Sequence, residues 1–349
     1  MRIAQVAPLG ESVPPRKYGG TERIVSYLTE AFVQMGHDVT LYASGDSKTA
    51  ARLRSVSLRS LRGEQANLDL IFRQVMADVH AARHGFDIIH FHVGWYEFPA
   101  FSRTQSLVLS TLHGPLDPPG VRRRIAAYPD FPLVSISNAQ RAPLPRQNWV
   151  ATIYHGIPDP GVNPRGGRGY LAFLGRISPE KRPDLAIEIA RRAGWPIKLA
   201  AKVDPVNEAY FQATIRPLLA QPGVDFIGEL DEPAKRAFLA GAHALLFPID
   251  WPEPFGLVMI EAFACGTPVI AYRRGSVPEI VEDGVTGFVV EGVESAVAAV
   301  ARVPALDRRA IQARFRERFT VARMVRDYLG LYERMIERSP EPRIQATSL

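Results

Sequence analysis

Short apolar runs separated by segments of helical periodicity are the feature that most constrains this 349-residue chain. The runs at 3–6, 39–42 and 87–93 have strand length, while apolar residues recur every three or four positions at 24–35 and 68–79. Parallel strands joined by crossover helices produce this alternation. Because the second half of the chain repeats it, we expect an α/β fold with doubly wound parallel sheets.

A chain of this length exceeds the usual single hydrophobic core, which favours two domains. The segment 158–169 holds three prolines and four glycines without periodicity, so we predict the domain boundary there. We expect Rossmann-like domains at 1–160 and 161–320, and at 321–349 a long amphipathic helix followed by a tail. The polar segment 46–66 is interpreted as a connection without regular structure.

The excess of positive charge is mild, at +6. The tight basic cluster is Arg122, Arg123 and Arg124. Nucleic-acid binding needs a broader basic face, so we expect no nucleic-acid partner. The arginine triplet is either a solvated surface or a contact with an anionic membrane or an acidic acceptor.

The chain has one cysteine, Cys265, which excludes an internal disulfide framework and fits a reducing compartment. Its first residues lack the features of a signal peptide, and no run of eighteen apolar residues occurs. We therefore expect a cytoplasmic protein that can attach peripherally to the inner face of the membrane.

The stretch 249–269 contains the residues most suggestive of chemistry. Glu253 lies in a turn held by two flanking prolines, and Gly256 lets a ligand approach the backbone. An apolar helix follows and ends at Gly266. Its N-terminal amides carry partial positive charge, so they suit an anion such as a diphosphate.

A second glutamate, Glu261, follows Glu253 by eight residues. If the helix reached both, their carboxylates would lie roughly 12 Å apart at about 1.5 Å rise per residue. They could then bracket a diphosphate, with each carboxylate accepting hydroxyl protons from a sugar. Two unrelated glutamates on a helix surface would have the same spacing.

Two cations and two glycines lie at other predicted strand ends. Arg176 and Lys181 follow the strand at 170–174 and can face one anion, although an exposed charge pair is the alternative. Gly19 and Gly20 precede the first helix. They could admit a diphosphate to the backbone, or form only a turn.

Histidines follow the central strands of the first domain. His113 comes directly after the strand at 106–112, and ligands bind at the carboxyl ends of strands in doubly wound sheets. We therefore expect His113 to be functional. His90 and His92 share one face of an earlier strand. Because no third ligand follows at a typical spacing, we predict no metal site and place both at the edge of the cleft.

Beyond these patterns, the chain resembles the family 4 retaining glycosyltransferases of the GT-B architecture, also called group 1 glycosyltransferases. The similarity covers nearly the whole chain and is densest in its second half. It is carried by Y-G-G-T-E-R at 18–23, L-G-R-I-S-P-E-K at 174–181, E-P-F-G-L-V-M-I-E at 253–261, G-T-P-V-I-A at 266–271 and S-V-P-E-I-V-E-D-G-V-T-G-F-V-V at 276–290.

The resemblance implies two Rossmann-like domains that face an interdomain cleft, with the last helix crossing back onto the first domain. It implies catalytic roles for Arg176 and Lys181 at the leaving diphosphate, for Glu253 at the sugar hydroxyls and for His113 on the far side of the sugar. Glu261 would bind the ribose. The implied donor-binding residues are Gly19, Gly20, Glu229, Leu230, Phe255, Gly256, Leu257, Val258 and Glu261.

The resemblance also implies a reaction: a hexose moves from a nucleotide-diphosphate sugar to an acceptor hydroxyl with retention of configuration. Family frequency favours UDP-glucose and then GDP-mannose. The acceptor would be a sugar, a lipid-linked saccharide or a small molecule, in cell-envelope or glycoconjugate biosynthesis. No two aspartates are two residues apart, so the D-x-D metal motif is absent, and we expect neither a metal requirement nor a cofactor.

Other enzyme classes fit the sequence less well. A dinucleotide oxidoreductase would have G-x-G-x-x-G after the first strand, and a P-loop NTPase would have G-x-x-x-x-G-K-[ST]; both are missing. The alternatives that the motifs leave are a sugar-nucleotide hydrolase or epimerase on the same fold, and a non-catalytic nucleotide-sugar-binding subunit.

Overall fold

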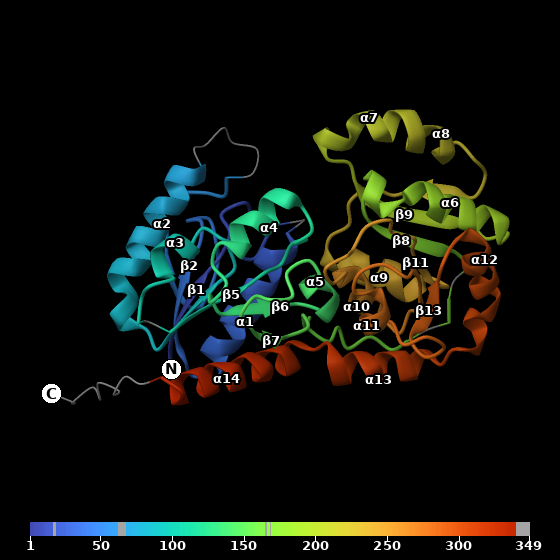
Figure 1. The fold of residues 1–349 in the computed structure, drawn as a ribbon. Helices are drawn as coiled ribbons and strands as arrows, with labels where there is room; N and C mark the ends of the chain where they lie inside the picture. Colours follow the sequence, from blue (N-terminus) through green and yellow to red (C-terminus); the bar gives the residue numbers. More distant parts are fainter. Residues whose placement is uncertain (17–18, 62–67, 106, 165, 168, 340–349) are drawn as a thin grey trace.

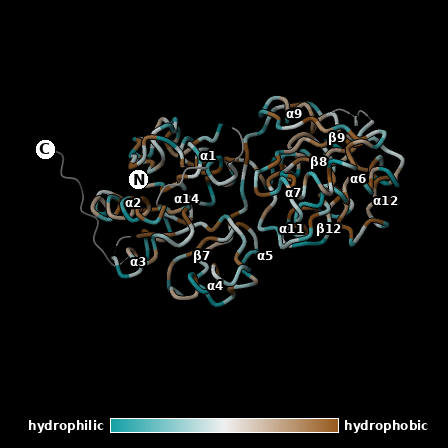
Figure 2. The backbone as a smooth tube through the Cα atoms, turned by 90° about the horizontal axis from the view of Figure 1, so that it is seen from above, coloured by the Kyte–Doolittle hydropathy of each residue, from teal (hydrophilic) through white to brown (hydrophobic). Residues whose placement is uncertain are grey.

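The computed structural model describes residues 1–16, 19–61, 68–105, 107–164, 166–167 and 169–339. They form two α/β domains side by side, joined along one face by helices α13 (Arg308–Arg318) and α14 (Val321–Glu337) (Figure 1). Seen from above, the domains are two separate lobes (Figure 2). The predicted fold class is confirmed. The domain limits at 160 and 320 stay predictions.

The sheet of the first domain is parallel in its described residues, with the strand order β3-β2-β1-β4-β5-β6-β7. Its strands are β1 (Arg2–Val6), β2 (Asp38–Tyr42), β3 (Arg52–Arg54), β4 (Ile88–Phe91), β5 (Val108–Thr111), β6 (Leu133–Ser135) and β7 (Trp149–Thr152). The helices around it are α1 (Gly20–Gln34), α2 (Leu68–Ala82), α3 (Phe98–Phe101), α4 (Pro119–Ala126) and α5 (Asn138–Arg141). The strand order changes direction between β1 and β4, which is where ligands bind in such sheets.

The second domain repeats this plan with the order β10-β9-β8-β11-β12-β13. Its strands are β8 (Leu171–Arg176), β9 (Ile197–Lys202), β10 (Val224–Phe226), β11 (Leu245–Phe247), β12 (Val269–Tyr272) and β13 (Gly287–Val290). Its helices are α6 (Pro183–Arg192), α7 (Glu208–Tyr210), α8 (Arg216–Leu219), α9 (Glu232–Gly241), α10 (Leu257–Ala264), α11 (Val277–Ile280) and α12 (Val293–Arg302). Here the order changes direction between β8 and β11, which brings the ends of these two strands together.

One strand differs from our expectation, because β3 lies within the segment 46–66 that we interpreted as irregular. It pairs with β2 at the edge of the sheet, where Leu53 opposite Leu41 is half-buried. The arginines on either side of Leu53 are exposed. An edge strand needs only one covered face and is often flanked by charge, so its sequence lacks the apolar run of a central strand.

The last helix, α14, packs on the first domain rather than on the second, as predicted. Its buried face includes Met324, Tyr328 and Tyr332, in one apolar cluster with Ile24 and Leu28 of α1. The apolar face of α14 therefore packs against the first domain (Figure 1). Residues 340–349, predicted as a tail, lie outside the described residues.

The chain crosses between the domains twice, and the two crossings lie side by side. Ile157 pairs with Thr320 in a parallel bridge. The N–H of Ile157 donates to the carbonyl oxygen of Phe319 at 2.9 Å, and the N–H of Val321 donates to the carbonyl oxygen of Ile157 at 3.1 Å. The domains are therefore joined by a paired, two-segment hinge.

Two features of the structure bear on a contact with a membrane. Among the described residues, no helix combines the length and the apolar character needed to cross a membrane. The basic triplet lies on α4, and Arg122, Arg123 and Arg124 are all exposed. The guanidinium carbon of Arg124 lies 5.0 Å from the ring centre of Trp95. Attachment to a membrane surface through this helix stays a prediction.

Candidate active site

Glu253 lies in the loop between β11 and α10, at the carboxyl edge of the second sheet. It is 7% exposed, and its carbonyl oxygen accepts from the N–H of Ser276 at 2.9 Å. Gly275 packs directly on this loop with φ +52°, and a Cβ there would lie 2.3 Å from the Glu253 carbonyl oxygen. Both the backbone angle and the lack of space require glycine. The loop position of Glu253 is thus fixed by the next motif along the chain.

The carboxylate of Glu253 is surrounded by compensating groups. The Lys181 ammonium pairs with its Oε2 atom, and the Trp251 indole N–H donates to the same oxygen at 3.0 Å. The Lys181 nitrogen also lies 4.6 Å from the centre of the Trp251 ring, within cation–π range. A carboxylate buried this far is costly unless it is paired and hydrogen-bonded. The sequence predicted Lys181 and Glu253 as site residues, but it gave Trp251 no role.

Arg176 reaches the same edge from the end of β8. Its guanidinium donates to Glu180 at 3.2 Å. The backbone of Glu180 accepts from the N–H of Asp250 at 2.9 Å. This bond ties the turn at 176–181 to the loop that carries Glu253. The motif of Arg176 and Lys181 and the motif of Glu253 therefore meet where β8 and β11 end.

The N-terminus of α10 opens beside this cluster. Gly256 caps it with φ +81°, and the first residues of the helix, Leu257 and Val258, are half-buried. Leu257 also packs against an apolar cluster of the first domain, and a Cβ added to Gly20 would lie 3.4 Å from its Cδ1 atom. Gly20 begins the 15-residue helix α1 after the buried Gly19. Two helix N-termini with partial positive charge thus face each other across the domains, an arrangement suited to an anion.

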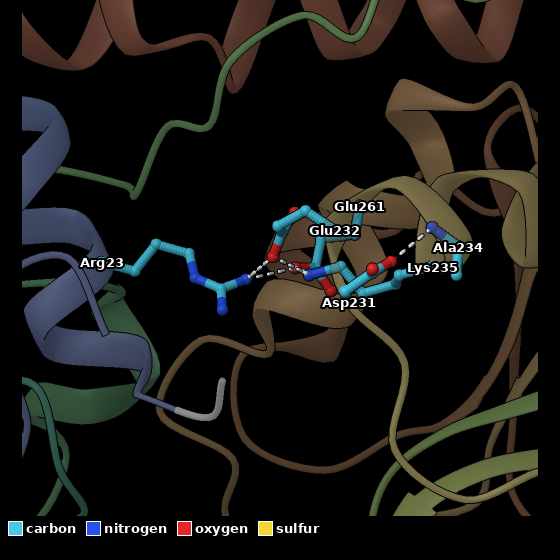
Figure 3. A network of polar contacts seen from close by, with 6 residues as sticks. All are labelled: Arg23, Asp231, Glu232, Ala234, Lys235 and Glu261. Atoms are coloured by element: carbon cyan, nitrogen blue, oxygen red, sulfur yellow. Dashed lines mark hydrogen bonds and ion pairs between the residues drawn. The ribbon is translucent and has the colours of Figure 1, made fainter. Parts of the chain in front are cut away.

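Glu261 lies within α10, which starts at Leu257, whereas Glu253 lies in the loop before this helix. The two glutamates therefore have different surroundings. Its carboxylate accepts from the Lys235 ammonium at 2.6 Å and lies 3.8 Å from the Arg23 guanidinium (Figure 3). Arg23 comes from α1 and also pairs with Glu232 of α9 (Figure 3). Cations from both domains therefore hold this glutamate. Its predicted contact with a ribose stays a prediction.

The other predicted donor-binding residues border the same region. Glu229 is exposed and Leu230 half-buried, on the loop between β10 and α9. Leu230 packs against the apolar cluster that Leu257 also contacts. Phe255 is 2% exposed, and its ring meets His155 edge-on with 4.9 Å between the ring centres. Tyr18, in the first motif, lies outside the described residues.

His113 lies just after β5, and its ring contacts two other histidines of the first domain. Its Nε2 atom lies 2.9 Å from His92 Nδ1, and its ring stacks on that of His155 at 5.2 Å. Burial lowers the pKa of His113 to about 3, and it lowers the pKa values of His90, His92 and His155 well below the usual range. All four rings are therefore neutral near pH 7.

Sequence reasoning missed two residues that support the first-domain side. The Gln140 amide donates to the carbonyl oxygens of Leu112 at 2.9 Å and Gly114 at 2.8 Å, which holds the loop of His113. Glu279 of α11 accepts from the backbone N–H of Asn138 across the domain interface. Neither contact belongs to a motif that the sequence shows, because each depends on how distant segments pack together.

Chemically, the arrangement offers a cationic and amide-rich surface for a diphosphate beside a carboxylate that can bind hydroxyl groups. In the described ranges, no group of three or more His, Cys, Asp or Glu side chains is placed to hold a metal ion. His90 and His92 instead bond to other side chains of the first domain.

Comparison with known families agrees with this geometry. The sequence model described as "Glycosyltransferase Family 4" matches residues 18–157, and the model described as "Glycosyl transferases group 1" matches residues 159–318. Together they cover every described strand except β1, and they include the loops that carry the cluster. The chain belongs to glycosyltransferase family 4. The ends of β8 and β11 lie within the segment that the second of these models matches.

Curated relatives of this glycosyltransferase match it over a shorter segment. A D-inositol 3-phosphate glycosyltransferase of Mycobacterium avium is 33% identical over 39% of the chain and 34% of the relative. The protein of that name from Kribbella flavida is 37% identical over 38% of the chain and 35% of the relative. The match thus spans about a third of the length of each relative.

Solved structures show the same fold over nearly the whole glycosyltransferase. AviGT4, involved in avilamycin A biosynthesis, has a TM-score of 0.74 at 24% identity and covers 97% of this chain and 98% of its own. HepE of Anabaena, in complex with UDP and glucose, has a TM-score of 0.73 at 19% identity, with 95% and 99% covered. At these identities the likeness shows the fold alone, which is GT-B.

Proposed function

We propose that this glycosyltransferase moves glucose from UDP-glucose, or as second choice mannose from GDP-mannose, to an acceptor hydroxyl with retention and without a divalent metal. The observation that carries the proposal is the pair of Lys181 and Glu253 beside the N-terminus of α10, with Arg176 at the same edge. This cluster has what a nucleotide-diphosphate sugar needs at its reacting centre.

The cations act on the leaving group. Expelling a diphosphate from the sugar concentrates negative charge on its oxygens while the sugar becomes oxocarbenium-like. Arg176, Lys181 and the amides at the start of α10 would stabilise that charge, and such preorganised groups usually make the largest catalytic contribution. Lys181 also pairs with Glu253. The residue that binds the diphosphate and the residue that binds the sugar hydroxyls would therefore be joined by an ion pair.

The reaction needs no protein nucleophile. The bond from the anomeric carbon to the diphosphate oxygen breaks, and a bond from the same carbon to the acceptor oxygen forms on the same face. The acceptor proton passes to the leaving diphosphate oxygen. The protein would bind, orient and exclude water, and His113 would contact the sugar from the first domain.

The donor and acceptor are supported by similarity. HepE, whose structures hold UDP, glucose and UDP-glucose, shares the fold over nearly the whole chain. The names of the matching curated relatives make inositol phosphate the first acceptor to test. Sugars and lipid-linked saccharides follow. The ribose would contact Glu261. The cations that bind Glu261 come from both domains, so they would help the domains to close over the donor.

Thermal unfolding tests the donor directly. The protein is unfolded with UDP, GDP and ADP and with UDP-glucose and GDP-mannose, each with and without EDTA. Ligand at a hundred times its dissociation constant adds about 2.7 kcal/mol, which raises the midpoint by several degrees. Stabilisation by uridine ligands that EDTA does not change supports the proposal. A midpoint that no nucleotide moves overturns it.

Product analysis separates the transferase from the hydrolase and epimerase. With radiolabelled UDP-glucose, a transferase forms a labelled acceptor product only when an acceptor is present. Release of free glucose at the same rate without acceptor would favour the hydrolase, and a changed sugar on the nucleotide would favour the epimerase. Binding without any conversion across the acceptor panel would favour the non-catalytic subunit.

A further inference from the structure

A chain of buried polar side chains crosses the first domain behind His113. It begins at the tyrosine hydroxyls of α14, passes through His90, Gln5 and His92, and reaches His113 beside the second domain. His90 is 0% exposed and His92 is 3% exposed. The proposed function uses only His113, so the remaining members need a role of their own.

The direction of the hydrogen bonds at His113 follows from Gln5. The carbonyl Oε1 atom of Gln5 lies 2.9 Å from His92 Nε2, and a carbonyl oxygen can only accept, so His92 Nε2 carries a proton. The neutral His92 ring then has a lone pair on Nδ1. Because His113 Nε2 lies 2.9 Å from that Nδ1 atom, His113 must donate through Nε2. Its own Nδ1 atom is left with a lone pair.

The other end of the chain is consistent with this direction. The Gln5 amide nitrogen lies 3.3 Å from the Tyr332 hydroxyl, which lies 2.6 Å from His90 Nδ1. His90 Nε2 lies 2.7 Å from the Thr111 hydroxyl, which lies 2.9 Å from the Tyr328 hydroxyl. Each group can donate to the next in one continuous order. A turned Gln5 amide would reverse the order, so a test must read the proton positions themselves.

The end of the chain points to a ligand. Among the described residues, His113 Nδ1 is buried and has no hydrogen-bond partner. A buried acceptor without a donor costs about 1–3 kcal/mol, and a bound hydroxyl would remove that cost. His113 also stacks on His155, which contacts Phe255 in the motif of Glu253. The His113 ring is therefore linked through His155 to the motif that carries the proposed sugar site.

We propose that Gln5 and His92 are positioning residues that fix His113 with its proton on Nε2, so that Nδ1 accepts a hydrogen bond from one hydroxyl group of the bound sugar. This inference rests on the proposed function and deepens it. The histidine chain makes His113 a specificity-determining acceptor, and it requires a sugar that carries a hydroxyl group at that position.

The proposal distinguishes three substituents at one carbon of the sugar. A hydroxyl can donate to Nδ1, whereas hydrogen makes no such bond and fluorine can only accept. At the carbon that faces His113, the deoxy and deoxyfluoro analogues should both bind about ten-fold more weakly than the parent sugar. If Nδ1 carried the proton, fluorine would replace the hydroxyl better than hydrogen does.

Nitrogen NMR reads the proton position without any substrate. In protein labelled with ¹⁵N-histidine, His113 is expected to show an unprotonated Nδ1 and a protonated Nε2. His92→Leu removes the acceptor and should give a mixture of His113 tautomers. His92→Asn, which can place an acceptor at the position of Nδ1, should restore the wild-type pattern. A wild-type His113 with its proton on Nδ1 overturns the proposal, and this spectrum decides even if a variant fails to fold.

Binding measurements test the consequence for substrates. Dissociation constants are measured for UDP-glucose and for its deoxy and deoxyfluoro analogues at each sugar carbon, with wild type, His92→Leu and His92→Asn. Equal weakening by both analogues at one carbon, lost in His92→Leu and kept in His92→Asn, supports the proposal. Fluorine that replaces hydroxyl at every carbon overturns it.

Different results would contradict the proposed function and the proposed positioning of His113. If UDP-glucose binds and is transferred but His113 Nδ1 is protonated, the positioning role of Gln5 and His92 and the acceptor role of His113 are wrong, while the proposed function stands. If His113 has the expected tautomer but no nucleotide sugar binds, the proposed function is wrong, and the sugar contact of His113 is wrong with it.

Discussion

The carboxylate of Glu279 accepts a hydrogen bond of 2.8 Å from the backbone N–H of Asn138, so a residue of the second domain caps a helix of the first. Its other oxygen accepts from the N–H of Ala139 at 2.6 Å, and the Tyr154 hydroxyl donates at 3.0 Å to the oxygen that binds Asn138. Helix N-termini favour such carboxylates. The motif at 276–290 therefore contacts both the first domain and the loop that carries Glu253.

Replacing Glu279 by Ala should weaken this interface. We expect the free energy of unfolding to fall by about 1–2 kcal/mol, as for the loss of other helix caps, because two amides lose their acceptor. Urea denaturation measures the change. Tyr154→Phe is the matched control, since it removes one bond to Glu279 but leaves the cap in place, and should cost less. Equal stability of Glu279→Ala and wild type would contradict the contact.

Replacing Lys181 by Ala should lower kcat by about 100-fold or more, because the leaving diphosphate loses a preorganised cation. Glu253 also loses its charge partner, so some loss of stability is expected. The protein should nevertheless stay folded at 25 °C. Steady-state kinetics and thermal unfolding measure the two effects. Lys198→Ala, on the neighbouring strand β9, is the control and should keep the wild-type rate. A wild-type rate in Lys181→Ala would refute its catalytic role.

Two glycines separate backbone strain from displacement of Glu253. Gly275 and Gly284 both have positive φ, at +52° and +75°, so alanine at either position is strained. A Cβ on Gly275 would collide with the backbone of Glu253, whereas one on Gly284 would meet nothing within 4 Å. Both variants should lose about 1 kcal/mol of stability from strain. Only Gly275→Ala should lose most of its kcat, and equal activity of the two variants would argue against a fixed Glu253.

Glu97 should make stability depend on pH. It is fully buried between β4 and α3, and burial raises its pKa to about 7, from 4.5 in the unfolded chain. The folded state therefore binds the extra proton between these values, and stability falls as pH rises from 4.5 to 7. Glu97→Gln, which cannot ionise, should be more stable than wild type by about 3 kcal/mol at pH 8.

The control for Glu97 is the same pair of proteins at pH 4.5, where their stabilities should nearly agree. Thermal unfolding over this range measures the difference. The lowered pKa of His113 acts in the opposite direction, since its contribution is lost as pH falls below about 6.5 toward 3. That effect is common to both proteins, so it cancels in the comparison. A difference that does not grow with pH would contradict a buried Glu97.

The meeting of Lys181 and Glu253 could be predicted because each follows a strand of the same parallel sheet. Residues after the carboxyl ends of adjacent strands share one edge, whatever their separation along the chain. The same rule led us to expect a functional role for His113, which follows β5. The helix that follows Glu253 was also expected, but not where it starts. The left-handed Gly256 begins α10 at Leu257, so the helix does not reach Glu253 and the estimate of about 12 Å between the glutamates does not apply.

Contacts between the domains could not be predicted in this way. Glu279 and Asn138 are 141 residues apart, and Arg23 and Glu232 are 209 apart. No periodicity links such residues, because their meeting depends on how two separately folded sheets dock. The direction of the histidine chain was hidden for a similar reason. His90 and His92 are visible as a pair, but Gln5 and Tyr332, which order their protons, come from the two ends of the chain.

The paired hinge and α14 set the order in which the molecule can be completed during synthesis. Tyr328 and Tyr332 are fully buried against the first sheet, yet they are made after every residue of the second sheet. Domains generally fold from the N-terminus as the ribosome releases them. Here one face of the first domain stays uncovered until the second domain and α14 have been synthesised. The first domain therefore begins to fold first but is completed last.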